Sequence, residues 1–133
     1  MTDDGSAMIR VVVAVALALA TTTLMVVTFA TAQAAGALAI GACGAYGQAY
    51  DFPSPGAATE RALSECQGET CRIVTTLRRG CAAFAVDGAN PCGAHGWARG
   101  PRLGAAQNEA LRGCYKDGGH DCVIRTFICD AKG

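Results

Sequence analysis

Residues 53–66 read PSPGAATERALSEC and residues 101–114 read PRLGAAQNEALRGC, with proline, glycine, three alanines, leucine and cysteine in register. A second matched pair, CGAYG at 43–47 and CGAHG at 92–96, comes shortly before these segments. Similarity at a fixed spacing indicates one structural unit written twice. We therefore expect two copies, residues 36–81 and 82–133, which fold together as one domain because no linker-like segment separates them.

Each copy has the pattern of two strands, a helix and a third strand. In the first copy Ser54 is a suitable helix N-cap before Pro55, and Ala58 and Ala62 lie on the same helix face as Cys66. A face of alanines lets a helix lie close to a sheet. The expected strands are 37–42, 45–50, 71–77, 82–86, 93–99 and 123–128, and the expected helices are 55–65 and 103–113. The predicted fold class is α+β: a duplicated β-β-α-β module with pseudo-twofold symmetry around a shared sheet, in a small disulfide-stapled domain.

Eight cysteines occupy matched places in the two copies. Cys66 and Cys71 flank one helix-to-strand turn, and Cys114 and Cys122 flank the other, so both pairs are suited to local bridges. The remaining cysteines are expected to pair as Cys43–Cys92 and Cys81–Cys129 near the pseudo-axis, where each bridge would join the two copies. An exchange of partners among these last four stays open.

The N-terminal segment has the features of an export signal. Residues 11–30 are apolar apart from threonines, and small-x-small sequences follow at 30–34. We expect residues 1–34 to be a cleaved signal peptide and residues 35–133 to be a single exported domain, secreted or in the cell envelope. The alternative is one membrane-spanning helix, since about 20 apolar residues can cross a bilayer. Export of a chain with an even number of cysteines favours disulfides over free thiols.

The charge and cysteine spacing argue against two classes of function. Residues 35–133 contain ten Lys or Arg and nine Asp or Glu, so a nucleic-acid partner is not expected. Four residues separate Cys66 from Cys71 and seven separate Cys114 from Cys122, which does not match paired zinc knuckles. We expect neither a metal nor a cofactor.

Catalytic side chains are few in the expected mature chain. It contains two histidines, His95 and His120, and two serines, of which Ser54 is better explained as a helix cap. No catalytic residue is predicted. The alternative function is a small cell-envelope hydrolase that uses His95 or His120 with a nearby carboxylate.

A binding surface is the remaining candidate site. Alternate strand residues share a face, so Tyr46, Gln48 and Tyr50 form one row and their counterparts His95, Trp97 and Arg99 form another. Arg78, Arg79 and Arg102 would add positive charge. The predicted binding residues are Tyr46, Tyr50, His95, Trp97 and Arg99. The alternative is that Trp97 fills the core against the alanine-rich helices. The leading hypothesis is a non-enzymatic module that binds an envelope component or, in a host-associated bacterium, a host protein.

Four segments carry a resemblance to a known family: Ala57 to Cys66, Cys71 to Thr76, Arg79 to Ala83, and Phe127 to Cys129. With them, the chain from about Ala37 to Cys129 resembles the bacterial secreted family called domain of unknown function 4189. It departs from the usual Ala-Ile-Ala-Tyr of the opening strand, because it has Gly41-Ala42 after Ile40. The resemblance implies export and a cystine scaffold. It implies no activity.

Overall fold

The computed structural model describes residues 8–15 and 34–129. The described residues divide into two units, residues 8–15 and residues 34–129. In the first unit, residues 8–15 form a helix, and the rest of the expected signal peptide lies almost wholly outside the described residues. Within the described ranges, none of the helices has the length and apolarity needed to span a membrane.

The second unit contains two modules with the same element order. The first has β1 (Ala35–Ile40), a short 3-10 turn η1 (Ala42–Gly44), β2 (Tyr46–Phe52), α2 (Pro55–Glu65) and β3 (Arg72–Leu77). The second has β4 (Cys81–Asp87), β5 (His95–Gly100), α3 (Leu103–Lys116) and β6 (Cys122–Cys129). The α+β class and the duplicated β-β-α-β module are confirmed.

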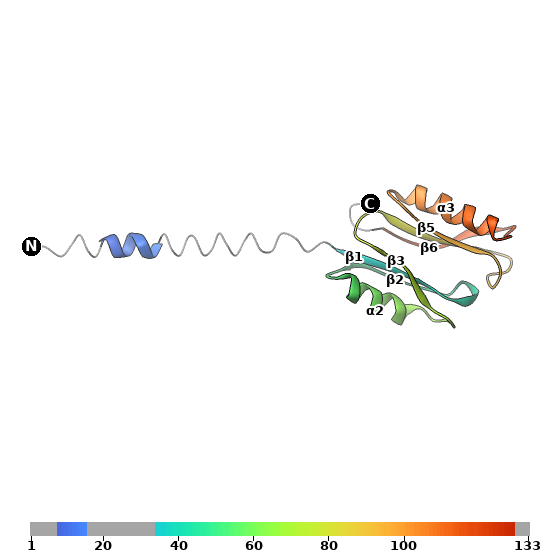
Figure 1. The fold of residues 1–133 in the computed structure, drawn as a ribbon, viewed down its shortest axis with the longest axis horizontal. Helices are drawn as coiled ribbons and strands as arrows, with labels where there is room; N and C mark the ends of the chain where they lie inside the picture. Colours follow the sequence, from blue (N-terminus) through green and yellow to red (C-terminus); the bar gives the residue numbers. More distant parts are fainter. Residues whose placement is uncertain (1–7, 16–33, 130–133) are drawn as a thin grey trace, which may run out of the picture. The chain divides into compact units, whose positions relative to one another are not determined.

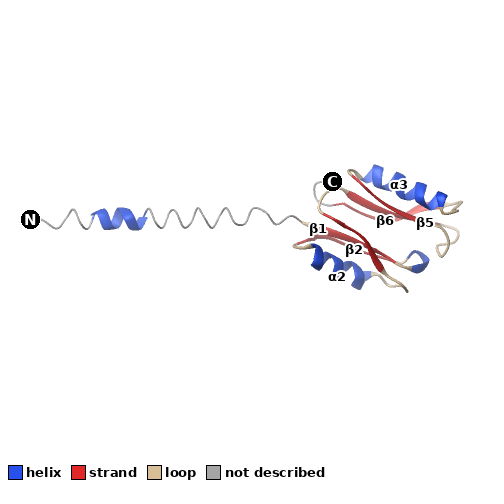
Figure 2. Cartoon of the chain, in the orientation of Figure 1, coloured by secondary structure: helices blue, strands red, loops and turns tan. Residues whose placement is uncertain are grey.

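The strands form two sheets and not the one shared sheet expected from the sequence. The orders are β2-β1-β3 and β5-β4-β6, and all pairings are antiparallel. Each module therefore builds its own sheet around its first strand, and no strand of one module pairs with a strand of the other. The sheets pack face to face, with α2 on one outer side and α3 on the other (Figures 1 and 2).

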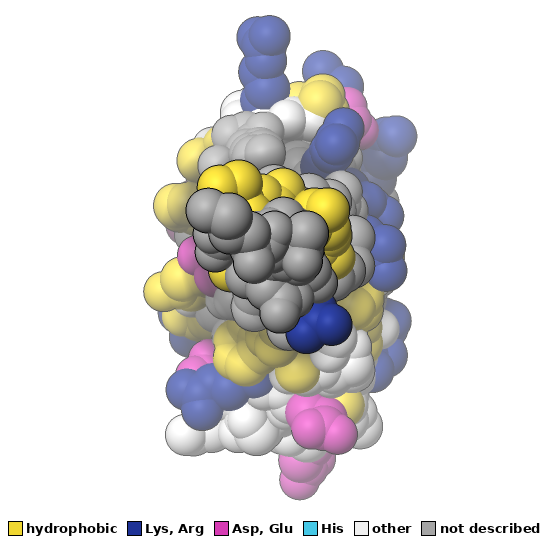
Figure 3. Space-filling model, turned by 90° about the vertical axis from the view of Figure 1, so that its left-hand side faces the viewer, with side chains coloured by type: hydrophobic (Ala, Val, Ile, Leu, Met, Phe, Trp, Pro, Cys, Tyr) yellow, Lys and Arg dark blue, Asp and Glu magenta, His cyan; other side chains and the backbone are white. Residues whose placement is uncertain are grey.

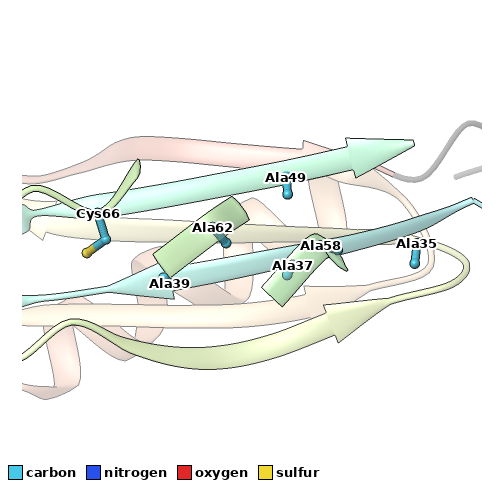
Figure 4. Close-up of a cluster of buried hydrophobic side chains, with 7 residues drawn as sticks. All are labelled: Ala35, Ala37, Ala39, Ala49, Ala58, Ala62 and Cys66. Atoms are coloured by element: carbon cyan, nitrogen blue, oxygen red, sulfur yellow. The ribbon is translucent and has the colours of Figure 1, made fainter. Parts of the chain in front are cut away.

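Three apolar layers hold this arrangement together. The layer between the sheets contains the larger side chains, among them Leu38, Ile40, Phe84, Val86 and Ile128. The two layers beneath the helices consist largely of alanine and cystine sulfur. Figure 4 shows the layer under α2: Ala35, Ala37, Ala39, Ala49, Ala58, Ala62 and Cys66. Every residue of β1 and β4 is buried, because these central strands contact a helix on one face and the opposite sheet on the other.

Glycine lets each helix lie against a strand backbone. A Cβ atom on Gly47 would lie 2.6 Å from the backbone nitrogen of Cys66 and closer still to the Ala62 carbonyl oxygen. Its counterpart Gly96 meets α3 in the same way, with Gly113 C at 2.7 Å. The helix itself begins as expected, since the Ser54 hydroxyl accepts a hydrogen bond from Ala57 N at 3.2 Å.

All four expected disulfides are present: Cys43–Cys92, Cys66–Cys71, Cys81–Cys129 and Cys114–Cys122. The expected role of one of them is wrong. Cys81 is the first residue of β4 and pairs in register with Cys129 of β6, so this bridge lies within the second sheet. Among the four disulfides, only Cys43–Cys92 links one module to the other.

The close helix–strand contact gives a matched test at two glycines. Gly47→Ala should lower the free energy of unfolding by about 1–3 kcal/mol, because the added methyl group meets backbone atoms that cannot rotate away. Gly104→Ala is the control: a Cβ atom there would have nothing within 4 Å, so the change should be neutral or stabilising by up to about 1 kcal/mol. Urea denaturation measures both. Equal effects of the two substitutions would contradict the packing described here.

The disulfides are expected to differ in their contribution to stability. Cys43 and Cys92 are 49 residues apart, whereas Cys66 and Cys71 are 5 apart. Loop-closure entropy then gives about 4 kcal/mol for the first bridge and about 2 kcal/mol for the second. Paired alanine substitutions, compared by urea denaturation, should show the larger loss for Cys43 and Cys92. A larger loss for the Cys66 and Cys71 pair would refute this ordering.

Candidate functional site

The two sheets meet along two edges, which are equivalent in the duplicated fold. β2 lies over β6 at one edge, and this edge is called the β2/β6 seam. At the other edge, residues of β3 and β5 line the same surface hollows, and this edge is called the β3/β5 seam. The predicted binding residues are divided between the two seams, so the sequence analysis was wrong to treat them as one patch.

Polar contacts between the sheets cross the β2/β6 seam. The Thr126 hydroxyl donates a hydrogen bond to Gln48 Oε1 at 2.7 Å. The Arg125 guanidinium lies over the Tyr46 ring, 5.7 Å from its centroid, and Arg125 Nε donates to the Gly44 carbonyl oxygen at 3.3 Å. Tyr46 also packs against the inter-sheet core. Tyr46 and Gln48 therefore take part in the contact between the two sheets, whereas Tyr50 is 59% exposed.

A hollow of about 530 Å³ opens beside Tyr46. Its lining comes from β2, the end of α2 and β6: Gly44, Ala45, Tyr46, Gly47, Gln48, Ser64, Glu65, Gln67 and Arg125. A carboxylate and a guanidinium both line it, so its charge is mixed. The Ser64 hydroxyl within it already donates a hydrogen bond to the Arg61 carbonyl oxygen at 2.8 Å.

The β3/β5 seam carries the row His95, Trp97 and Arg99. Gly96 and Ala98, which alternate with them, face α3. The row therefore points away from the helix, and the alternative that Trp97 fills the core against the alanine-rich helices is not what the structure shows. Trp97 is 37% exposed, and His95 and Arg99 are exposed beside it. The His95 ring meets the buried Phe84 ring edge-on at 6.3 Å.

Three hollows lie along β5, the first between β5 and the end of α3 and the other two at the β3/β5 seam. The first, of about 440 Å³, is lined by His95, Gly96, Trp97, Gly113, Lys116 and Asp117. The second, of about 170 Å³, is lined by Ile40, Gly41, Ala42, Thr70, Arg72 and His95. The third, of about 450 Å³, is lined by Thr76, Arg78, Arg79 and Arg99. Cationic side chains contribute to all three, and Asp117 is the only acidic residue among their lining residues.

His95 lies beside Asp117, the C-cap residue that follows α3. Asp117 Oδ2 accepts a hydrogen bond from the His95 backbone nitrogen at 3.0 Å and lies 3.6 Å from His95 Nδ1. Both side chains are about half exposed, at 48% and 53%. A histidine next to a carboxylate is the arrangement of a general base, in which the carboxylate orients the imidazole. Neither serine of the domain lines a hollow with His95, and all eight cysteines are in disulfides.

His120, the second candidate histidine, makes a structural contact through its backbone. Its backbone nitrogen donates to Asp87 Oδ2 at 3.0 Å, and the Ala89 nitrogen donates to Asp87 Oδ1 at 2.9 Å. These two hydrogen bonds, the His120 one first, lower the pKa of the Asp87 carboxyl group below its ordinary value. Asp87 thus ties the β4–β5 turn to the turn that precedes β6.

The described part of the chain contains no candidate metal site, because no three His, Cys, Asp or Glu side chains cluster there. The sequence did not point to two side chains that contact the predicted binding residues: Asp117, beside His95, and Arg125, over Tyr46. Arg125 had a detectable signal: it occupies the β-bulge of β6 where the first copy has the core residue Val74. A charged residue in place of a core residue within a repeat indicates a changed environment.

The comparisons with known proteins agree with this architecture. The NMR structure of Rv1813c from Mycobacterium tuberculosis is similar, with a TM-score of 0.54 and 26% sequence identity, over 73% of this chain and 75% of that chain. No curated protein matches the sequence. The family described as domain of unknown function DUF4189 matches residues 35–129, from the first strand to the last, and the chain belongs to that family.

Proposed function

We propose that this protein is an exported, cystine-stabilised binding module without catalytic activity, and that its partner binds at the β3/β5 seam. The partner is an envelope component or, in a host-associated bacterium, a host protein. The observation that carries the proposal is Trp97, a large aromatic side chain left 37% exposed between His95 and Arg99 on an edge strand.

The composition of the seam supports binding. Tryptophan and arginine are the residue types most often found as energetic anchors of interfaces. Trp97 lines a hollow together with Lys116, and a second hollow lies farther along β5 at Arg99, so a partner has room to contact the indole ring and the basic residues along the strand. β5 also has a free backbone edge, because β4 pairs with it on one side only. Such an edge offers unpaired N–H and C=O groups to an extended partner.

The disulfides support export. Four disulfides in a domain of this size are typical of proteins that mature in an oxidising compartment. They also compensate for helix–sheet layers built from alanine, which bury little apolar surface per residue. The apolar segment at residues 11–30 and its small-residue sites supply the proposed cleaved signal.

One observation favours a second candidate, a small cell-envelope hydrolase. His95 and Asp117 lie within 3.6 Å of each other beside a hollow, so the imidazole has an orienting carboxylate. In such an enzyme His95 would activate water directly, because the hollows that His95 lines contain no serine and no free thiol.

A pull-down with immobilised domain separates these proposals. Wild-type protein and Trp97→Ala are exposed side by side to envelope and host lysates, and the bound partner is quantified after its identification. Trp97→Ala removes the proposed anchor, so this variant should bind the partner about tenfold more weakly or worse. Tyr50→Ala is the matched control, because Tyr50 is an exposed aromatic side chain at the other seam.

Unfolding midpoints of the variants must match that of the wild type for the comparison to count. Equal capture by wild type and Trp97→Ala would show that the β3/β5 seam is not the binding surface. If His95→Ala abolishes turnover of an envelope substrate while capture is unchanged, the hydrolase takes the place of the binding module.

A further inference from the structure

Three arginines meet at one end of the β3/β5 seam. Arg78 and Arg79 follow β3, Arg99 is near the end of β5, and together with Thr76 they line a hollow of about 450 Å³. This group of four residues is called the arginine corner. Figure 3 looks at this end of the domain, and Lys and Arg side chains gather along the right-hand side of the view.

The backbone fixes the corner by a close contact. Gly80 has a φ of +91°, and a Cβ atom on it would lie 2.6 Å from the Gly100 carbonyl oxygen. The turn between β3 and β4 therefore lies directly against the end of β5. This contact holds Arg79 next to the strand that carries Arg99, although they come from different modules.

No acidic side chain of the described residues neutralises the corner. The ion pairs of the domain lie elsewhere, between Arg61 and Glu65, Arg112 and Glu109, and His95 and Asp117. No Asp or Glu lines the hollow. Three like charges that share one hollow repel each other, so the corner favours a bound anion.

The duplication shows that the fold does not need an arginine at the position of Arg99. Tyr50 occupies in β2 the place of Arg99 in β5. Phe127 corresponds to Thr76, since each pairs with the matched alanine of its central strand, Ala83 and Ala37. The other seam thus carries aromatic side chains, 59% and 48% exposed, on the same backbone. Positive charge at the arginine corner is therefore a property of one seam, separate from the folding requirements.

From these observations we infer that the arginine corner binds a dianionic phosphoryl group carried by the ligand of the seam, an inference that rests on the proposed binding function. Guanidinium groups present paired N–H donors that match phosphate oxygens, and the Thr76 hydroxyl can add another donor. Two negative charges balance the corner better than a single carboxylate. Trp97 lies two residues from Arg99 on the same face of β5, so a ring attached to the phosphate can stack on the indole.

The test is a titration of the folded domain, residues 35–133, followed by NMR of the arginine Nε–H and tryptophan indole N–H groups. Inorganic phosphate, phenyl phosphate and acetate are compared at constant ionic strength, because screening alone moves exposed signals. We expect saturable shifts of Arg78, Arg79 and Arg99 with both phosphates and none with acetate. Phenyl phosphate should also shift the Trp97 indole signal and bind more tightly than inorganic phosphate.

Charge-matched variants identify the site. Arg78→Gln/Arg99→Gln should weaken phosphate binding about tenfold or more, since it removes two charge-assisted contacts. Arg61→Gln/Arg112→Gln removes the same charge from the two helices, away from the seam, and should change affinity less than about twofold. Amide spectra confirm that both variants are folded. Linear shifts with phosphate, equal shifts with acetate, or equal losses in the two variants would each overturn the inference.

Failure here is distinguishable from failure of the proposed function. A partner that requires Trp97 but binds equally well to Arg78→Gln/Arg99→Gln would leave the binding module intact and refute the phosphoryl ligand. Saturable phosphate binding, together with equal partner capture by wild type and Trp97→Ala, would support the phosphate site and refute the proposed binding surface.

Discussion

The backbone of each helix lies against the backbone of a strand, and only glycine and alanine fit between them. Gly47 meets α2 and Gly96 meets α3 at distances that leave no room for a Cβ atom. The alanine layers of the two modules follow from this contact, since larger side chains on the facing positions would push the helix away. The bulky apolar residues are consequently confined to the other face of each sheet, where the two modules meet through residues such as Leu38 and Phe84.

The same constraint explains why the domain carries four disulfides. Alanine layers bury little apolar area, so the helices are also tied by Cys66–Cys71 and Cys114–Cys122, each of which links a helix end to the following strand. Cys43–Cys92 joins the modules themselves. With the frame fixed in this way, the edges between the sheets are free to differ. One edge is crossed by the contacts of Gln48 and Arg125, and the other is lined by exposed aromatic and basic residues.

The local features of the fold could be predicted from the sequence because they depend on short-range spacing. The Ser54 cap, the bounds of α2 and the local pairs Cys66–Cys71 and Cys114–Cys122 belong to this group. The pairs Cys43–Cys92 and Cys81–Cys129 were expected from the symmetry of the repeat, with an exchange of partners left open. The stacking of two sheets and the position of the Cys81–Cys129 bridge within one sheet depend on which strands pair, and alternation does not encode that. The predicted binding residues are divided between the seams for the same reason: Tyr46 and His95 occupy the same position in the repeat, but the stacking of the sheets places them at opposite seams.

The central claim is that the two seams have equivalent positions in the duplicated fold but different roles. The β2/β6 seam stabilises the fold, and the β3/β5 seam binds a partner. Exchanging the two rows tests it most directly. One variant carries His95→Tyr, Trp97→Gln and Arg99→Tyr, and the other carries Tyr46→His, Gln48→Trp and Tyr50→Arg. Urea denaturation should show the larger loss of unfolding free energy for the β2 exchange, because it removes the Thr126–Gln48 hydrogen bond and the Arg125–Tyr46 contact. An equal or larger loss for the β5 exchange would contradict the account, since the fold would then depend on the residues assigned to binding.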